Sequence, residues 1–210
     1  MTTQHPALFS PISLRGRALP SRVVFGAHTT NMAQDGLPGP QMRAYYEERA
    51  RGGAGMIVVE PMPVHATAVL TARNFRHCDD SVIPHFAELV AGVKAYGTVI
   101  IQQLYHVGQH GDGDLSFQPN WSPSGLPSYH DSDGSHAMSI AEIDEIVDGH
   151  VQAALRCQQA GFDGVEIWNC YHSLIDQFLT PWSNHRHDAY GGSLENRMRL
   201  GTRIFEAVRA

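Results

Sequence analysis

The sequence runs Val99-Ile100-Ile101-Gln102-Gln103-Leu104-Tyr105-His106 near its middle, so a short apolar segment passes directly into polar side chains. Continuous β-branched apolar residues are typical of a strand that is covered on both faces. Polar side chains at the end of such a strand are candidates for a functional site. The architecture of the whole chain therefore depends on whether other strands show the same transition.

Three further apolar segments, at 22–26, 55–59 and 165–167, also pass directly into polar side chains. The polar residues that follow them are His28-Thr29-Thr30-Asn31, then Glu60, then Trp168-Asn169-Cys170-Tyr171-His172. Apolar residues at helical spacing predict helices after these strands, at 42–50 and 83–93, from the Ser139–Glu142 capping box to Gly161, and from Ser193 onward. The order of strand and helix is thus repeated four times.

Four such repeats predict parallel strands joined by right-handed crossovers. An open doubly wound sheet and half of a (β/α)8 barrel both satisfy this order. A doubly wound sheet binds its ligand at one switch point, whereas a barrel uses the carboxyl ends of all its strands. Polar residues follow every strand and no GxGxxG follows the first, which favours the barrel. The expected fold class is α/β of the TIM (β/α)8-barrel type, with about four βα units in this chain.

A complete barrel takes ~250 residues, so four units in 210 residues are not expected to close one alone. Residues 1–210 are therefore interpreted as the N-terminal part of a barrel. Residues 1–21 should include a hairpin around Gly16, because glycine tolerates the positive φ of tight turns. Residues 111–136, rich in Ser, Pro, Asp and Gly, should form a substrate-side loop over the barrel mouth.

The composition argues against several classes of protein. The chain has 15 Lys and Arg against 21 Asp and Glu, and this net charge of −6 argues against nucleic acid or an anionic membrane as a partner. Its apolar runs are far shorter than the ~20 residues of a membrane span, and its first residues show no secretion signal. Cys78, Cys157 and Cys170 have no CxxC spacing, so we expect a reducing, cytoplasmic setting without disulfides.

Six motifs stand out along the chain: Leu8-Phe9-Ser10-Pro11-Ile12, Gly36-Leu37-Pro38, Tyr45-Tyr46-Glu47-Glu48-Arg49-Ala50-Arg51-Gly52-Gly53, Gln103-Leu104-Tyr105-His106-Val107-Gly108, Asp176-Gln177-Phe178-Leu179-Thr180-Pro181, and the block 184–197. Together they resemble the Old Yellow Enzyme family of FMN-dependent NADH:flavin oxidoreductases. The likeness is greatest to the branch with trimethylamine dehydrogenase and 2,4-dienoyl-CoA reductase. In that family the chain continues through four more βα units.

The resemblance implies FMN as the cofactor and NADH or NADPH as the reductant. It implies that four residues line the flavin ring, mostly through their backbone: Gly26, Ala27, His28 and Thr29. Gln103 would bond the pyrimidine edge of the ring, because an amide offers both a donor and an acceptor. Glu60 lies at the end of the second strand, where the family's backbone also approaches the ring. A purely structural interpretation is that Thr29, Glu60 and Gln103 only satisfy backbone groups of the loops.

The residues after the fourth strand depart from the family. Most members place His-x-x-His or His-x-x-Asn there to bind a substrate oxygen, and this sequence has Trp168 and Tyr171 at those two positions. His172 lies one residue further. These three are the candidate catalytic residues: Tyr171 can serve as a proton source, and the two aromatic faces can hold a methylated ammonium by cation–π attraction. The structural alternative is that Trp168 and Tyr171 only pack the barrel mouth.

The expected function is FMN-dependent oxidoreduction, with hydride passing between NAD(P)H, the flavin and a small-molecule substrate, either an activated alkene or an N-methylated amine. The alternative from another class is a catalytically incomplete half-barrel, which is a truncated remnant or needs a homo-oligomer or a complementing half-barrel. A flavin-free lyase would need a lysine at a strand end, and the single lysine, Lys94, lies in a predicted helix. No metal site is expected, since the alternating histidines in 184–188 lack a third ligand in fixed geometry.

Overall fold

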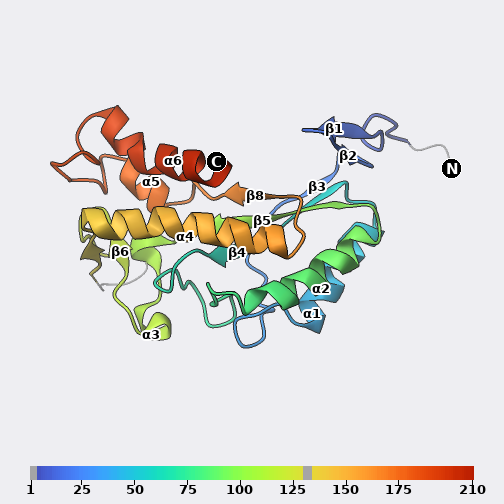
Figure 1. Ribbon diagram of the computed structural model, residues 1–210, viewed down its shortest axis with the longest axis horizontal. Coiled ribbons are helices and arrows are strands. Elements are labelled where there is room, and N and C mark those ends of the chain that lie inside the picture. The colour runs from blue at the N-terminus through green and yellow to red at the C-terminus, as the bar shows by residue number, and fades with distance from the viewer. Residues whose placement is uncertain (1–3, 130–133) are drawn as a thin grey trace.

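The computed structural model describes residues 4–129 and 134–210. Its centre is a sheet of four parallel strands, in the spatial order β3 (Val24–Phe25), β4 (Met56–Pro63), β5 (Val99–Tyr105) and β8 (Gly164–Ile167). The strands follow each other in space in the same order as along the chain (Figure 1). In a doubly wound sheet the spatial order of the strands reverses at the switch point. The unbroken order of these four strands therefore confirms the TIM-barrel type.

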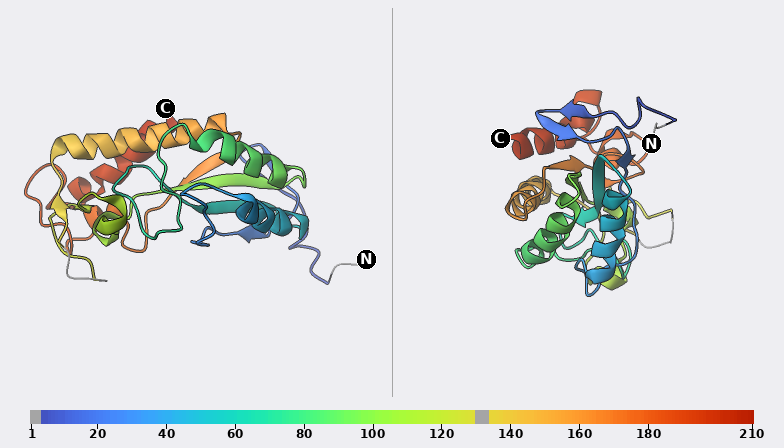
Figure 2. Two further views of the ribbon diagram at one scale, coloured as in Figure 1. Left: turned by 90° about the horizontal axis from the view of Figure 1, so that it is seen from below. Right: turned by 90° about the vertical axis from the view of Figure 1, so that its right-hand side faces the viewer.

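Four helices follow the four strands: α1 (Pro40–Arg51), α2 (Val82–Lys94), α4 (Ile140–Gln159) and α6 (Leu194–Arg209). They confirm the four predicted helices. The Ser139–Glu142 capping box is present, and the Ser193 side chain accepts a hydrogen bond from the Asn196 N–H. Figure 2 shows α1, α2 and α4 along one side of the sheet. None of the helices described is both long and apolar enough to cross a bilayer.

The two faces of the sheet differ in what they bury. Ile57, Val59, Ile100 and Leu104 belong to the main hydrophobic core, which the helices cover. Alternate side chains of a strand point to opposite faces, so the residues between these four face away from the helices. Ile101, for example, is only half-buried and lies outside that core. This second face becomes the inner, concave side of a barrel, and we call it the concave face.

The second strand is longer than expected. It was predicted at 55–59 with Glu60 after its end, whereas β4 continues to Pro63 and contains Glu60. The pairing with β5 shifts register between Val59 and Met62, which indicates a bulge. Pro61 lies in the shifted stretch, where the missing N–H of proline costs no ladder hydrogen bond. The first strand is shorter than expected, with Val24–Phe25 paired instead of the whole of 22–26.

Short elements gather at the carboxyl ends of the four parallel strands (Figures 1 and 2). We call this end of the sheet, together with these elements, the mouth. They are η1 (Gly108–His110), α3 (Gly113–Ser116), β6 (Trp121–Ser122), β7 (His136–Ala137) and α5 (Leu174–Leu179). The expected substrate-side loop at 111–136 thus contains α3 and β6 and ends where β7 begins. Residues 130–133 of that expected loop lie outside the described residues.

A hairpin lies at the opposite end of the sheet, as expected within residues 1–21. Strands β1 (Ile12–Leu14) and β2 (Arg17–Leu19) pair antiparallel, and Gly16 has a φ of +80° in the turn. Arg17 and Lys94 each lie 2.9 Å from Oδ1 of Asp163, whose side chain is only 6% exposed. Oδ2 of Asp163 accepts the Ile100 N–H at 3.0 Å. One carboxylate therefore joins the hairpin, α2 and β5 to the start of β8.

Replacing Asp163 by alanine should lower the free energy of unfolding by about 1–3 kcal/mol, because it removes the acceptor of the Ile100 N–H and an ion-pair partner of Arg17 and Lys94. Urea denaturation followed by circular dichroism measures this. Asp148→Ala, on the outer face of α4, is the control and should change the stability by less than about 0.5 kcal/mol. Equal effects of the two substitutions would contradict the proposed role of Asp163.

Candidate functional site

The backbone after β3 is open on the side that would face a ligand. Gly26 is exposed, and a Cβ built on it would have no atom within 4 Å. Ala27 and Thr29 are half-buried. The His28 side chain contacts α1 instead, since its Nε2 lies 2.9 Å from the hydroxyl of Tyr45. The His28 ring is thus engaged elsewhere, and the segment can offer its backbone. That these four residues line a flavin stays a prediction.

Glu60 is completely buried within β4 and fastens the segment after β3. Its Oε2 accepts the Thr30 N–H at 2.7 Å, and its own N–H donates to the Tyr46 hydroxyl at 2.9 Å. Oε1 has no hydrogen-bond partner in the described part of the chain. Burial raises the pKa of the Glu60 carboxyl, and hydrogen bonding by Thr30 offsets only part of this rise. The Glu60 side chain thus holds a neighbouring loop, while its role towards a flavin stays a prediction.

The two adjacent glutamines of β5 point to different surroundings. Gln102 is fully buried, and its amide nitrogen donates to the backbone oxygens of Glu60 and Gln103 at 2.6 and 2.9 Å. Gln103 is half-buried on the concave face, where its Nε2 donates to Glu166 at 2.6 Å. Within the described ranges, the carbonyl oxygen Oε1 of Gln103 accepts no hydrogen bond. Gln103 is therefore the one of the pair that is placed to meet a ligand.

Trp168 and Tyr171, the two aromatic candidates after β8, have different neighbours. The half-buried Trp168 ring lies 5.5 Å from the Tyr105 ring, and its indole N–H donates to the Cys170 sulfur at 2.9 Å. Tyr171 is 76% exposed, and burial together with the neighbouring Tyr171 raises the pKa of Tyr129. The indole N–H is thus not directed at a substrate in this arrangement, whereas both ring systems line the mouth.

The turn that carries Tyr171 and His172 is strained. Both residues adopt a left-handed backbone, with φ of 54° and 57°, which costs a bulky side chain about 1–3 kcal/mol each. Two residues of α5 hold this turn. Asp176 accepts the His172 N–H at 3.0 Å, and the Gln177 amide donates to the His172 carbonyl at 2.5 Å. Strain that is fixed by specific partners is typical of functional sites.

The structure adds two residues that the sequence did not single out for the mouth. The Tyr129 ring lies tilted against the ring of the buried His110 at 4.3 Å and is 5.9 Å from the ring of His172. The sequence offered no signal for Tyr129, because irregular loops have no periodicity. Tyr129, Tyr171 and His172 form a ring cluster with His110, built from three separate segments.

His106 belongs to the scaffold behind the mouth. It is buried, its Nδ1 accepts the Gly108 N–H at 3.0 Å, and its Nε2 lies 2.9 Å from the Thr67 hydroxyl. Burial lowers the pKa of His106 well below its ordinary value, with the nearby His65 and His150 as further causes. The ring therefore stays neutral and connects the loops after β4 and β5.

The block 184–188 is also structural. The Asn184 amide donates to the carbonyls of Phe178 and Tyr190 at 2.6 and 2.7 Å. The Arg186 guanidinium bonds the backbone oxygens of Pro123 and Met138 at 3.0 and 2.5 Å. Both residues therefore hold the loop against its neighbours. In residues 4–129 and 134–210, no group of three or more His, Cys, Asp or Glu side chains is placed to hold a metal ion.

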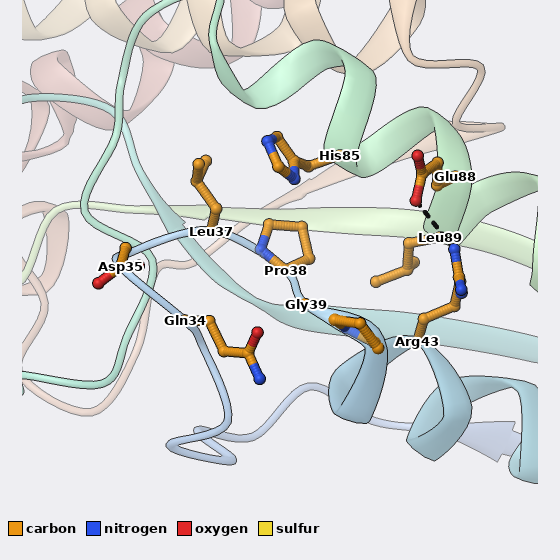
Figure 3. Close-up of a pocket in the computed structure, with 10 residues that line it drawn as sticks. Gln34, Asp35, Leu37, Pro38, Gly39, Arg43, His85, Glu88 and Leu89 are labelled. Atoms are coloured by element: carbon orange, nitrogen blue, oxygen red, sulfur yellow. Dashed lines mark hydrogen bonds and ion pairs between the residues drawn. The ribbon is translucent and has the colours of Figure 1, made fainter.

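A separate cavity of about 360 Å³ lies between α2 and the loop before α1 (Figure 3). Arg43 and Glu88 form an ion pair of 2.9 Å beside it, and His85 and Leu89 line the α2 side. None of the residues predicted to form the site lines this cavity. The candidate site is therefore the mouth and not this outer cavity.

Changing Glu60 to glutamine should make stability less dependent on pH. Because its pKa is raised in the folded state, the stability contributed by Glu60 is present below its unfolded pKa of about 4.3 and lost as pH rises through the folded value. Urea denaturation between pH 4 and pH 9 should therefore show Glu60→Gln gaining stability over the unchanged chain as pH rises. Glu206→Gln, on an exposed part of α6, is the control. A difference that stays constant across this range would contradict the prediction.

Comparison with known proteins matches the chain to one family. Residues 7–210 match the model of the NADH:flavin oxidoreductase / NADH oxidase family. The chain is 37% identical to an NADPH dehydrogenase of Bacillus pumilus, over 96% of this chain and 59% of that protein. It is 34% identical to an N,N-dimethylglycine/sarcosine dehydrogenase of Chromohalobacter salexigens, over 97% of this chain and 30% of that protein.

Solved structures agree with this. The fold matches morphinone reductase in complex with tetrahydroNAD with a TM-score of 0.91 and 32% identity, over 97% of this chain and 60% of that one. The chain thus spans 60% or less of the length of these three relatives. The four parallel strands, the motifs and the family match lead to one conclusion: the chain belongs to the NADH:flavin oxidoreductase / NADH oxidase family, the Old Yellow Enzyme group that its sequence resembles.

Proposed function

We propose that this chain forms one wall of an FMN-dependent oxidoreductase site that transfers hydride between NADH or NADPH, the flavin and a small organic substrate. The observation that carries the proposal is the Gln103 amide. It lies at the carboxyl end of β5 on the concave face, and its Oε1 has no donor in the described ranges. The family match and the relatives named as NADPH dehydrogenase and morphinone reductase support the same reaction class.

The residues at the strand ends fit a flavin ring. A flat ring needs close approach by backbone, and Gly26 leaves that space open at the end of β3. The pyrimidine edge of a flavin alternates carbonyl and N–H groups, and an amide such as that of Gln103 matches both. Bound FMN would supply the hydride chemistry itself. This chain's residues would place the ring and close one side of the site to water.

Two substrate classes suit the mouth differently. An activated alkene with a carbonyl needs donors aimed at the oxygen where charge develops, and here the Trp168 N–H is already donated to Cys170. An N-methylated ammonium needs electron-rich ring faces, and Trp168, Tyr171 and Tyr129 supply such faces around the mouth. The relative named N,N-dimethylglycine/sarcosine dehydrogenase supports the amine. We therefore propose an N-methylated amine as the substrate ahead of a simple enone. If an enone were the substrate, Tyr171 would be its proton donor.

We also propose that completion of the site needs further βα units beyond the four that the sheet contains. In the described sheet, β3 and β8 each pair with one neighbour only, so each leaves an edge unpaired. TIM barrels usually bind phosphate with the loops after strands seven and eight, and the described sheet has four strands. Flavin binding by these residues should therefore depend on the ring and not on the phosphate.

Titrating flavin into the chain tests the proposed function. Riboflavin and FMN should bind with affinities within about twofold of each other, because the ring supplies the contacts. Gln103→Leu should weaken both roughly tenfold, since an unpaired buried polar edge costs about 1–3 kcal/mol. Quenching of flavin fluorescence measures both affinities.

Gln152→Leu, on the exposed face of α4, is the matched control and should bind flavin like the unchanged chain. Failure of the chain to bind any flavin would contradict the proposed function. One tightly held FMN per monomer would instead contradict the need for further βα units.

The choice of substrate is tested in a barrel that is completed with the further βα units and loaded with FMN. Bleaching of the flavin by N,N-dimethylglycine should be faster than NADPH-driven reduction of cyclohexenone. Trp168→Ala should slow the amine reaction roughly 10–30-fold, because a desolvated cation–π contact contributes up to ~2 kcal/mol. Tyr171→Ala should slow it roughly 2–5-fold, because an exposed ring contributes about 0.5–1 kcal/mol. Tyr96→Ala, at the end of α2, is the control. Fast enone turnover with a flavin that amines leave oxidised would exclude the amine.

A further inference from the structure

Glu166 has no role in the sequence-based prediction, yet it makes a short contact on the concave face. The Nε2 of Gln103 donates to Oε1 of Glu166 at 2.6 Å. β5 and β8 place these two residues directly opposite each other in register. Opposite residues on one face of a sheet are near enough for their side chains to interact. The contact is therefore built into the pairing of the two strands.

This contact determines which way the Gln103 amide points. An ionised carboxylate only accepts hydrogen bonds, so the nitrogen of the amide must face Glu166. Turning the amide over would place its oxygen against the carboxylate oxygen at 2.6 Å, where the two would repel each other. Oε1 and the second N–H of Gln103 are thereby left for another partner.

We propose that Glu166 is a positioning residue for the flavin: it locks the Gln103 amide in the orientation that meets the pyrimidine edge and adds a negative charge beside that edge. The inference rests on the proposed function, because it assumes that Gln103 meets a flavin. A reduced flavin is richer in electrons than an oxidised one, so a nearby negative charge disfavours the reduced form. Glu166 should therefore make the flavin harder to reduce.

Two substitutions separate the orientation from the charge. Glu166→Gln keeps an oxygen that can accept from Gln103 but removes the charge. Glu166→Leu removes both the acceptor and the charge. Glu206→Gln, which removes an exposed carboxylate on the outer helix α6, is the control for the loss of charge alone. A merely structural cross-strand pair would change stability in urea but not the midpoint potential of a bound flavin.

The orientation is measured without flavin, in the 15N-labelled chain, from the side-chain NH2 resonances of Gln103. In the unchanged protein, the proton that Gln103 donates to Glu166 should be shifted downfield by this charge-assisted hydrogen bond, and the shift should vanish in Glu166→Leu. Identical Gln103 resonances in the unchanged protein and Glu166→Leu would overturn the lock.

The consequence for the flavin is measured in FMN-loaded protein. Glu166→Leu should weaken FMN binding roughly tenfold, which matches the loss of one hydrogen bond. Glu166→Gln should bind FMN within about threefold of the unchanged protein but show a more positive midpoint potential. An unchanged potential in Glu166→Gln would overturn the charge effect. The chain could bind no flavin although the NH2 resonances show the hydrogen bond between Gln103 and Glu166. In that case the proposed function would be wrong, and the role of Glu166 towards a flavin would be wrong as well.

Discussion

The register between β4 and β5 is the constraint on which the rest of the structure depends. It puts Ile100 and Leu104 under the helices and leaves Ile101 and Gln103 on the concave face. A slip of one residue would exchange the two sets and turn Gln103 away from the concave face. The hydrophobic core and the candidate site therefore lie on opposite faces of the same strand pair. A change in the register of β4 and β5 would disturb both of them.

The bulge in β4 extends this constraint to the loops. By turning Glu60 into the protein, it gives the Thr30 N–H a buried acceptor and so ties the segment after β3 to the sheet. The turn after β8 is tied in a comparable way, by side chains of α5 that hold the His172 backbone. Two segments of the mouth that have no regular structure thus owe their shape to residues in regular elements.

The sequence was sufficient to predict the repeated strand–helix order, the barrel type and the family, because these depend on periodicity, caps and local motifs. The sequence also singled out Gln103, and not Gln102, as the candidate flavin contact, but it did so through the family resemblance and not through geometry. It placed Glu60 after its strand, since a bulge next to a proline has no periodic signal. The neighbours of Trp168 and Tyr171 were not predictable either, because Tyr105 and Tyr129 reach them only through the folded chain. The same holds for the contact of Glu166.

The ion cluster of Asp163 lies at the end of the sheet opposite the mouth, and this distance has an evolutionary consequence. Arg17 and Lys94 fix the hairpin and the strand starts without using any residue that faces a ligand. Mutations at the mouth are thus partly uncoupled from folding, so that new specificities can be sampled without loss of the scaffold. Relatives at 32% and 34% identity carry names as different as morphinone reductase and N,N-dimethylglycine/sarcosine dehydrogenase. Such diversification is what a scaffold anchored away from its chemistry permits.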